Sequence, residues 1–449
     1  MRIAWTRANR PAGLLAFAVI AVLLSARVAD AADEPGEGAA SGIAERQMTS
    51  PPARGVRRIA GRYLTLVTDL PPGGAVDALP DVFDRAVPQW CDYFGVRPAK
   101  AIGWRPRAFL MGRRQTFQAS GLLPDDLPDF AHGFSRGQQL WLDEHPTDYY
   151  RRHLLLHEGT HSFMNSLLGG CGPTWYMEGI AELLATHAYR GGELRLGYFP
   201  TRREEVPMLA RIQLVQQAVA EGRGVALSTI MAYPPRGARA DNEFYAWCWA
   251  AAAFFDGHAR YRDRFHHMAQ QVQRSDFNRT FRQLLADDWP HVVIEWRLFT
   301  NGLEYGHDRA RTAVEFRAGR PVGHDGAVTT IAADRGWQST GWRVEAGRPY
   351  AVTARGRYQI VRKPKVWWCE PGGVTIHYYR ARPLGMVLGT VIPDDPIDRG
   401  PAGQIAPLAI GLKADLVPEV TGTLYVKINE SSGALGDNAG TFEVALRPK

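Results

Sequence analysis

The alternation of apolar and polar residues predicts strands and helices in the first third of the chain. Apolar residues between Val82 and Phe94 recur at helical spacing. A helix beginning near Pro146 can be capped by Thr147 or Asp148, and it carries three consecutive leucines at 154–156. Strands with alternating or continuous apolar patterns are predicted at 63–68, 107–111 and 138–143.

The pattern changes twice along the rest of the chain. Up to about Leu303 it is helical, and from Thr329 onward it consists of short β-prone segments separated by Gly, Pro and Asp. The fold class is therefore predicted to be α+β, with a mixed sheet followed by helices and then an all-β sandwich. Helices are predicted at 211–220, 243–256, 260–273, 277–285 and 287–299, and strands at 350–354, 374–379 and 423–428.

The N-terminus has the pattern of an export signal. Three arginines precede an apolar run from Gly13 to Ala26, and Ala29-Asp30-Ala31 offers small residues for cleavage. The alternative is an uncleaved anchor, although the run is short for a membrane span. We expect a secreted or periplasmic protein with no membrane span after cleavage. The predicted divisions are a signal peptide at 1–31, a flexible leader at 32–56, a catalytic domain at 57–305, a linker at 306–325 and a β-sandwich at 326–449.

The net charge and the cysteines add little to these predictions. The net charge of +7 comes from scattered arginines without a nucleic-acid-binding motif, so we expect no nucleic-acid partner and only a mild attraction to acidic surfaces. The sequence has no CxxC pair, which would indicate a zinc site held by cysteines. Export would permit disulfides. Three full pairings are open to the four cysteines, Cys91, Cys171, Cys248 and Cys369.

The chemistry is concentrated in the sequence His157-Glu158-Gly159-Thr160-His161. Residues four apart share a helix face, so His157 and His161 can bind one zinc ion while Glu158 lies beside it as a general base. A catalytic zinc ion needs a third protein ligand. A metzincin would place Gly and His where this chain has Met164 and Leu167, so that class is excluded.

The best third ligand is Glu178, which follows His161 by 17 residues. That distance lets the first helix end at Gly169-Gly170 and a second, antiparallel helix begin. Glu182 lies one turn further on the same face and can accept a hydrogen bond from a ligand histidine, with His157 the preferred partner. The competing assignment makes Glu182 the ligand and Glu178 the accessory.

The motif followed by residues 173–182 (PTWYMEGIAE) resembles the gluzincin metallopeptidases of the peptidase MA clan, over about residues 58–303. The resemblance implies His157, His161 and Glu178 as zinc ligands and Glu158 as general base and proton shuttle. It also implies a peptide or protein substrate, and that the strand at 138–143 edges the cleft.

Other aromatic and histidine side chains have weaker claims. Tyr245 is the candidate to stabilise the oxyanion, against the alternative of a core aromatic residue. His153 precedes the motif by one turn and is expected at the surface or as a support for the ligands. His266 and His267 are expected on a solvated helix face.

The C-terminal segment at about 326–447 resembles the galactophilic PA-IL-like lectins, with Gly336–Gly341, Thr423–Glu430 and Asp437–Val444 as the matching stretches. The resemblance implies calcium held by Glu430, Asp437 and Asn438, and a carbohydrate partner. The chain departs from the pattern because Glu430 replaces a shorter Asp and Ala434 replaces a hydroxyl residue. The alternative is a hairpin turn rich in Asn, Asp and Gly.

The leading hypothesis is an exported zinc metallopeptidase whose C-terminal sandwich targets or stabilises it. A second hypothesis is a catalytically inactive, peptidase-like binding protein; retention of Glu158 between its neighbouring histidines argues against it. A third is a zinc hydrolase acting on a non-peptide amide.

Overall fold

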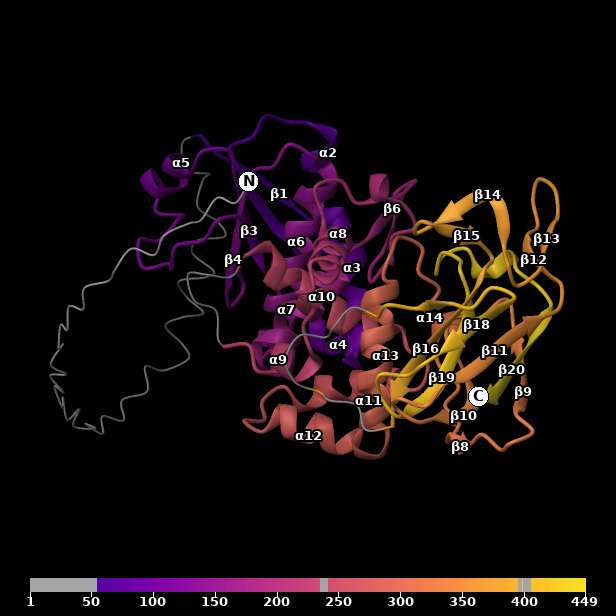
Figure 1. The fold of residues 1–449 in the computed structure, drawn as a ribbon. Coiled ribbons are helices and arrows are strands. Elements are labelled where there is room, and N and C mark those ends of the chain that lie inside the picture. Colours follow the sequence, from indigo (N-terminus) through magenta and orange to yellow (C-terminus); the bar gives the residue numbers. More distant parts are fainter. Residues whose placement is uncertain (1–54, 235–240, 395–397, 399–404) are drawn as a thin grey trace, which may run out of the picture. The chain divides into compact units, whose positions relative to one another are not determined.

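The computed structural model describes residues 55–234, 241–394, 398 and 405–449, so the predicted signal peptide and all but the end of the leader lie outside the described residues. The described part of the chain begins with a mixed sheet, of which strands β1, β3 and β4 are labelled in Figure 1. The strand order of this sheet is β1-β2-β3-β5-β4. Strands β2, β3 and β5 are parallel, and β1 and β4 pair antiparallel at the two edges. The strands are β1 (Arg57–Ala60), β2 (Thr65–Thr68), β3 (Arg107–Met111), β4 (Gly133–Arg136) and β5 (Gln139–Asp143).

The place of β5 in this sheet corrects one expectation. The strand predicted at 138–143 is paired on both sides, with β3 and with β4. The expectation that it edges the cleft is therefore wrong, and β4 is the edge strand on that side. Its four residues, Gly-Phe-Ser-Arg, are too few and too mixed to show a strand period in the sequence.

Four helices, each packed against the next, position the residues of the candidate site. They are α3 (Leu79–Phe94), α6 (Asp148–Phe163), α7 (Thr174–Ala185) and α10 (Asn242–Gly257). Thr147 caps α6 as predicted, because its side chain accepts a hydrogen bond from the backbone N–H of Tyr150. A π-helical turn at Met164–Leu168 and Gly169, with φ of 78°, end the helix where the glycines were expected to end it.

Two glycines set the distances between these helices. A Cβ at Gly159 would lie 2.7 Å from Phe83 and 2.9 Å from Trp90 of α3. A Cβ at Gly179 would lie 2.6 Å from the carbonyl oxygen of Cys248 on α10. Because neither glycine has a side chain, α6 packs closely on α3 and α7 packs closely on α10.

The other predicted helices are present with one exception, and several short helices were not among the predictions. The stretch at 260–273 is predicted as one helix, but it divides into α11 (Arg262–His267) and a 3-10 turn at Met268–Gln271. Further helices are α2 (Gly74–Asp77), α4 (Pro98–Ala101), α5 (Arg114–Ala119), α8 (Arg211–Ala220), α9 (Leu227–Met231), α12 (Phe277–Leu284), α13 (Trp289–Gly302) and α14 (Arg309–Thr312), and 3-10 turns lie at Arg203–Glu205 and Ala286–Asp288. A small hairpin joins β6 (Ala188–Arg190) and β7 (Glu193–Arg195).

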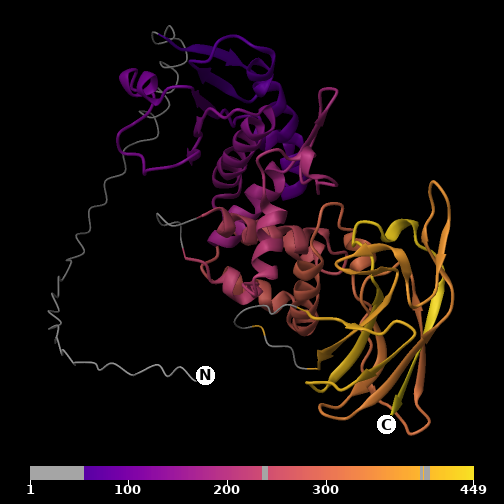
Figure 2. The ribbon, with the colours of Figure 1, turned by 45° about the horizontal axis from the view of Figure 1, so that its top comes forward.

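The C-terminal region is rich in strands, as predicted (Figure 2). Two sheets, β17-β16-β19-β10-β8 and β18-β11-β20-β9, contribute apolar residues to a common core, which fits a β-sandwich. The strands are β8 (Arg320–Pro321), β9 (Ala327–Ala332), β10 (Gln338–Val344), β11 (Tyr350–Arg355), β12 (Tyr358–Val361), β13 (Trp367–Cys369), β14 (Val374–Tyr379), β15 (Arg382–Leu384), β16 (Val387–Pro393), β17 (Leu408–Ala409), β18 (Lys413–Leu416), β19 (Gly422–Ile428) and β20 (Thr441–Pro448), with a 3-10 turn at Leu435–Asp437.

The cysteines, the predicted linker and the search for a membrane-spanning helix bear on three further points of the sequence analysis. All four cysteines are buried and free, so none of the three disulfide pairings is formed. The predicted linker at 306–325 contains helix α14 and strand β8. A search of the described residues finds no helix with the length and apolar character that a bilayer crossing requires.

Candidate metal centre

Three predicted ligand side chains from α6 and α7 meet at one point. The Nε2 atoms of His157 and His161 are 3.1 Å apart, and Oε2 of Glu178 lies 3.3 Å and 3.5 Å from them. The two imidazoles come from successive turns of α6, and α7 brings the carboxylate across. All three side chains are buried, with Glu178 fully excluded from solvent.

These separations fit a tetrahedral zinc ion. With bonds of about 2.0–2.1 Å, a tetrahedral ion holds its ligand atoms about 3.3–3.4 Å apart. Two imidazole nitrogens and one carboxylate oxygen are the donor types of a catalytic site that keeps its fourth position for water or substrate. The residues therefore suit zinc in number, chemistry and spacing, while the same donors also suit other divalent transition metals.

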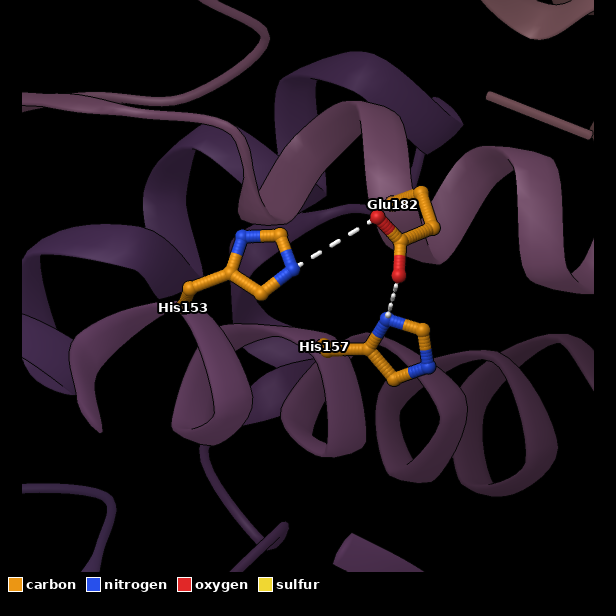
Figure 3. Close-up of side chains that lie close together, drawn as sticks. All are labelled: His153, His157 and Glu182. Atoms are coloured by element: carbon orange, nitrogen blue, oxygen red, sulfur yellow. Dashed lines mark ion pairs between the residues drawn. The ribbon is translucent and has the colours of Figure 1, made fainter. Parts of the chain in front are cut away.

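Glu182 supports this cluster from the far side of His157. Its carboxylate lies between two imidazoles, with Oε1 3.4 Å from Nδ1 of His157 and Oε2 3.6 Å from Nε2 of His153 (Figure 3). Because Glu182 faces Nδ1, the Nε2 atom of His157 points away from it, toward Glu178. The geometry thus favours Glu178 as ligand and Glu182 as the group that fixes the tautomer of His157.

Arg211, at the start of α8, is the residue that the sequence reading missed. Its guanidinium donates to both oxygens of Glu182 at 2.9 Å, a bidentate ion pair with both side chains buried. A second cation beside Glu182 would be repelled by this arginine, so the cluster of His153, His157 and Glu182 is better explained as a hydrogen-bonded support than as another metal site. Arg211 follows Glu182 by 29 residues, and no local sequence pattern connects the two.

The electrostatics of the cluster favour positive charge at the ligand position. Burial lowers the pKa of His157, but hydrogen bonds to Glu178 and Glu182 outweigh it and raise that pKa to about 10. Burial raises the pKa of Glu182, yet the charges of Arg211 and His153 hold it well below its ordinary value. An ionised carboxylate therefore stands behind His157 at neutral pH.

His153 is buried, with an exposed fraction of 1%, so a surface position is wrong. Its Nδ1 lies 3.1 Å from the carbonyl oxygen of Ala185, and its Nε2 faces Glu182. Its position is therefore that of a support for the ligands, which was the other role predicted for His153. The solvated face expected for the two later histidines holds for His267, whereas His266 is half-buried against Asp256 at 2.8 Å.

Glu158 lies beside the cluster and under the edge strand. It is buried, and its Oε2 has no hydrogen-bond partner among the described residues. A Cβ at Gly133 of β4 would lie 2.8 Å from its Oε1, so only glycine allows the strand to pass this close. Gly133 is a second residue that sequence reading missed, because a lone glycine in a loop-like stretch gives no signal of its neighbour.

Tyr245, the predicted oxyanion residue, lies near the ligands. Its ring centroid is 6.4 Å from that of His157, and the guanidinium of Arg211 lies 5.4 Å from the ring centroid. The side chain is half-buried on the first turn of α10. This position is compatible with contact to a bound substrate, and its role stays a prediction.

The residues predicted to hold calcium lie in the segment between β19 and β20 and have protein partners. Oε1 of Glu430 accepts from the N–H of Ser431 at 3.0 Å, and Oδ2 of Asp437 accepts from the N–H of Arg362 at 3.1 Å. Asn438 donates to a backbone carbonyl at 3.1 Å, while its own Oδ1 is buried without a partner. Calcium at this loop stays a prediction.

The comparisons with known proteins leave the family open. No protein-family model and no curated protein sequence matches the chain. Among solved structures, the N-terminal domain of EclA, described as a PllA-like lectin, is similar with 16% identity, 28% coverage of this chain, 100% coverage of its own and a TM-score of 0.22. A TM-score this low supports no conclusion about fold or ligand.

Proposed function

We propose that the chain is an exported zinc-dependent metallopeptidase in which His157, His161 and Glu178 hold the ion and Glu158 is the general base. The observation that carries this proposal is the convergence of three buried ligand atoms at separations of 3.1, 3.3 and 3.5 Å. Zinc, when bound, would polarise the substrate carbonyl and lower the pKa of a water molecule.

Glu158 performs the proton transfers. It takes a proton from the attacking water while the water oxygen bonds to the carbonyl carbon, and it returns that proton to the nitrogen as the C–N bond breaks. One water is consumed, and a carboxylic acid and an amine are released. Burial suits this role, and so does the absence of a hydrogen bond to Oε2 from any residue that the structure describes, because no such donor competes for that oxygen.

The substrate is proposed to lie along β4. This strand ends the sheet on its side and passes directly over Glu158 at Gly133. An extended peptide that added to this edge would place its backbone beside the general base. Tyr245 is proposed to donate to the carbonyl oxygen as its charge develops. The C-terminal sandwich is proposed to target or stabilise the catalytic region.

The test is Glu158→Gln, with Glu193→Gln on the exposed hairpin as the matched control. We expect zinc content to be equal in all three proteins, and cleavage of a mixed peptide library, followed by mass spectrometry, to fall about 10²–10⁴-fold only in Glu158→Gln. Full activity in that variant would overturn the mechanism. A zinc-loaded wild type that cleaves no peptide would favour the binding-protein hypothesis, or a non-peptide amide if a panel of acyl amides is hydrolysed.

A further inference from the structure

Two neighbouring hairpins of the C-terminal region expose large apolar side chains. They are β12–β13 and β14–β15, which lie at the same end of the strand-rich region (Figure 1) and touch through Trp367 and His377, whose ring centroids are 4.8 Å apart. We call the exposed side chains the hairpin patch. Its members, with their exposed fractions, are Val366 (43%), Trp368 (49%), Ile376 (76%) and Tyr378 (62%).

These side chains have no evident role in folding. The neighbouring residues of each strand do the packing, since Cys369 is buried in the sandwich core and Tyr379 donates to a carboxylate oxygen of Glu304 at 3.0 Å. Arg380 at the adjoining turn donates to the carbonyl oxygen of Asn301 at 2.8 Å. The β14–β15 hairpin is thus fixed by one set of residues, while Ile376 and Tyr378 are left in water, at a free-energy cost that a partner surface would relieve.

The same hairpins are strongly basic. Residues 357–384 contain six arginines and lysines and one acidic residue, a net charge of +5 within a chain whose total is +7. The β12–β13 hairpin alone carries four exposed cations that form no ion pair with another described residue. These cations are Arg357, Arg362, Lys363 and Lys365.

We propose that the hairpin patch docks the protein on the surface of an anionic phospholipid bilayer. Lysine and arginine complement the lipid phosphates, Trp and Tyr suit the headgroup boundary, and aliphatic side chains enter the acyl region. The most exposed member, Ile376, decides against a polysaccharide, because it offers neither a flat ring for a sugar to stack on nor a hydrogen bond. Apolar contact and charge act together, which is what reversible anchoring requires.

The experiment measures co-sedimentation of the purified chain with vesicles of phosphatidylcholine, alone or with about one third phosphatidylglycerol. Every variant is prepared with the same N-terminus, so any contribution of the leader is common to all. The test variants are Ile376→Ser with Tyr378→Ser, and Lys363→Gln with Lys365→Gln. The control is Val328→Ser with Val417→Ser, which removes two exposed apolar side chains (58% and 59%) outside the hairpins.

Wild type and control are expected to bind the anionic vesicles alike. Each test variant is expected to lower the partition coefficient about tenfold or more, and the lysine variant is also expected to show a weaker salt dependence than wild type. Wild type that fails to bind anionic vesicles at low salt, or test variants that bind like wild type, would overturn the proposal. Retention on chitin or peptidoglycan that depends on Trp368 but is not matched by vesicle binding would assign the patch to a glycan instead.

Discussion

Helices α6–α7 and the loop at 429–438 are both predicted from sequence to hold a metal ion, but their predicted ligand atoms have different surroundings in the structure. In the helix pair, three donors from two rigid elements reach separations of 3.1–3.5 Å, and a buried ion pair stands behind them. In the loop, Glu430 and Asp437 accept hydrogen bonds from backbone N–H groups, which a cation would have to share. A sequence spacing becomes a credible site when its residues lie on helices or strands that fix the direction of the ligand atoms.

The first prediction concerns the support of the helix site. Arg211→Met should raise the zinc dissociation constant about 10–100-fold, because Glu182 loses the cation that keeps it ionised and oriented toward His157. Competition with a chromogenic chelator measures this constant. Arg152→Met is the control, since Arg152 donates to His187 and not to Glu182. Unchanged affinity in Arg211→Met would show that α6 and α7 orient the ligands without this ion pair.

The distance between α7 and α10 gives the next effect. Gly179→Ala would place a Cβ 2.6 Å from the carbonyl oxygen of Cys248, so the helices must separate, at a cost of about 3 kcal/mol in the free energy of unfolding. Gly74→Ala in α2, where a Cβ meets nothing within 4 Å, is the control and should be neutral or slightly stabilising. Denaturant unfolding measures both. Equal stability of the two variants would contradict the role given to Gly179.

The third prediction concerns the loop. Burial raises the pKa of Glu430 to about 7 from an ordinary 4.5, so between these pH values the folded state binds more protons than the unfolded state. The free energy of unfolding should therefore fall by about 3 kcal/mol as pH rises from about 4.5 to 8, and Glu430→Gln should remove that fall. Thermal unfolding across this pH range measures it.

Calcium binding gives a second test of the difference between the loop and the helix pair. A cation at the loop would offset the cost of the buried Glu430 carboxylate at pH 8. A rise in melting temperature on addition of calcium that Glu430→Gln abolishes would place the ion there. The contrast drawn between the loop and the helix pair would then no longer hold.

Much of the architecture and the main site were predictable because their signals are local. The boundaries of α8 and β14 agree with the predicted 211–220 and 374–379, since regular apolar spacing and turn residues mark both elements. His157 and His161 follow from helix geometry, and Glu178 from the glycines that allow the chain to reverse.

The rest depends on contacts between distant segments. Arg211 reaches Glu182 only after α8 and α7 have both packed on α10, and Gly133 meets Glu158 only after a four-residue strand has joined the sheet. The burial of His153 likewise depends on contacts with α7. None of these juxtapositions leaves a period or a motif in the sequence, so pattern reasoning had no means to find them.

The most direct test of the central claim is the zinc content of the purified protein by mass spectrometry, in wild type, His161→Ala, Glu178→Gln and Glu182→Gln. We expect one zinc per chain in wild type, none in the first two variants, and zinc retained with weaker affinity in Glu182→Gln. Full zinc in Glu178→Gln, with loss in Glu182→Gln, would contradict it by exchanging the roles of the two glutamates.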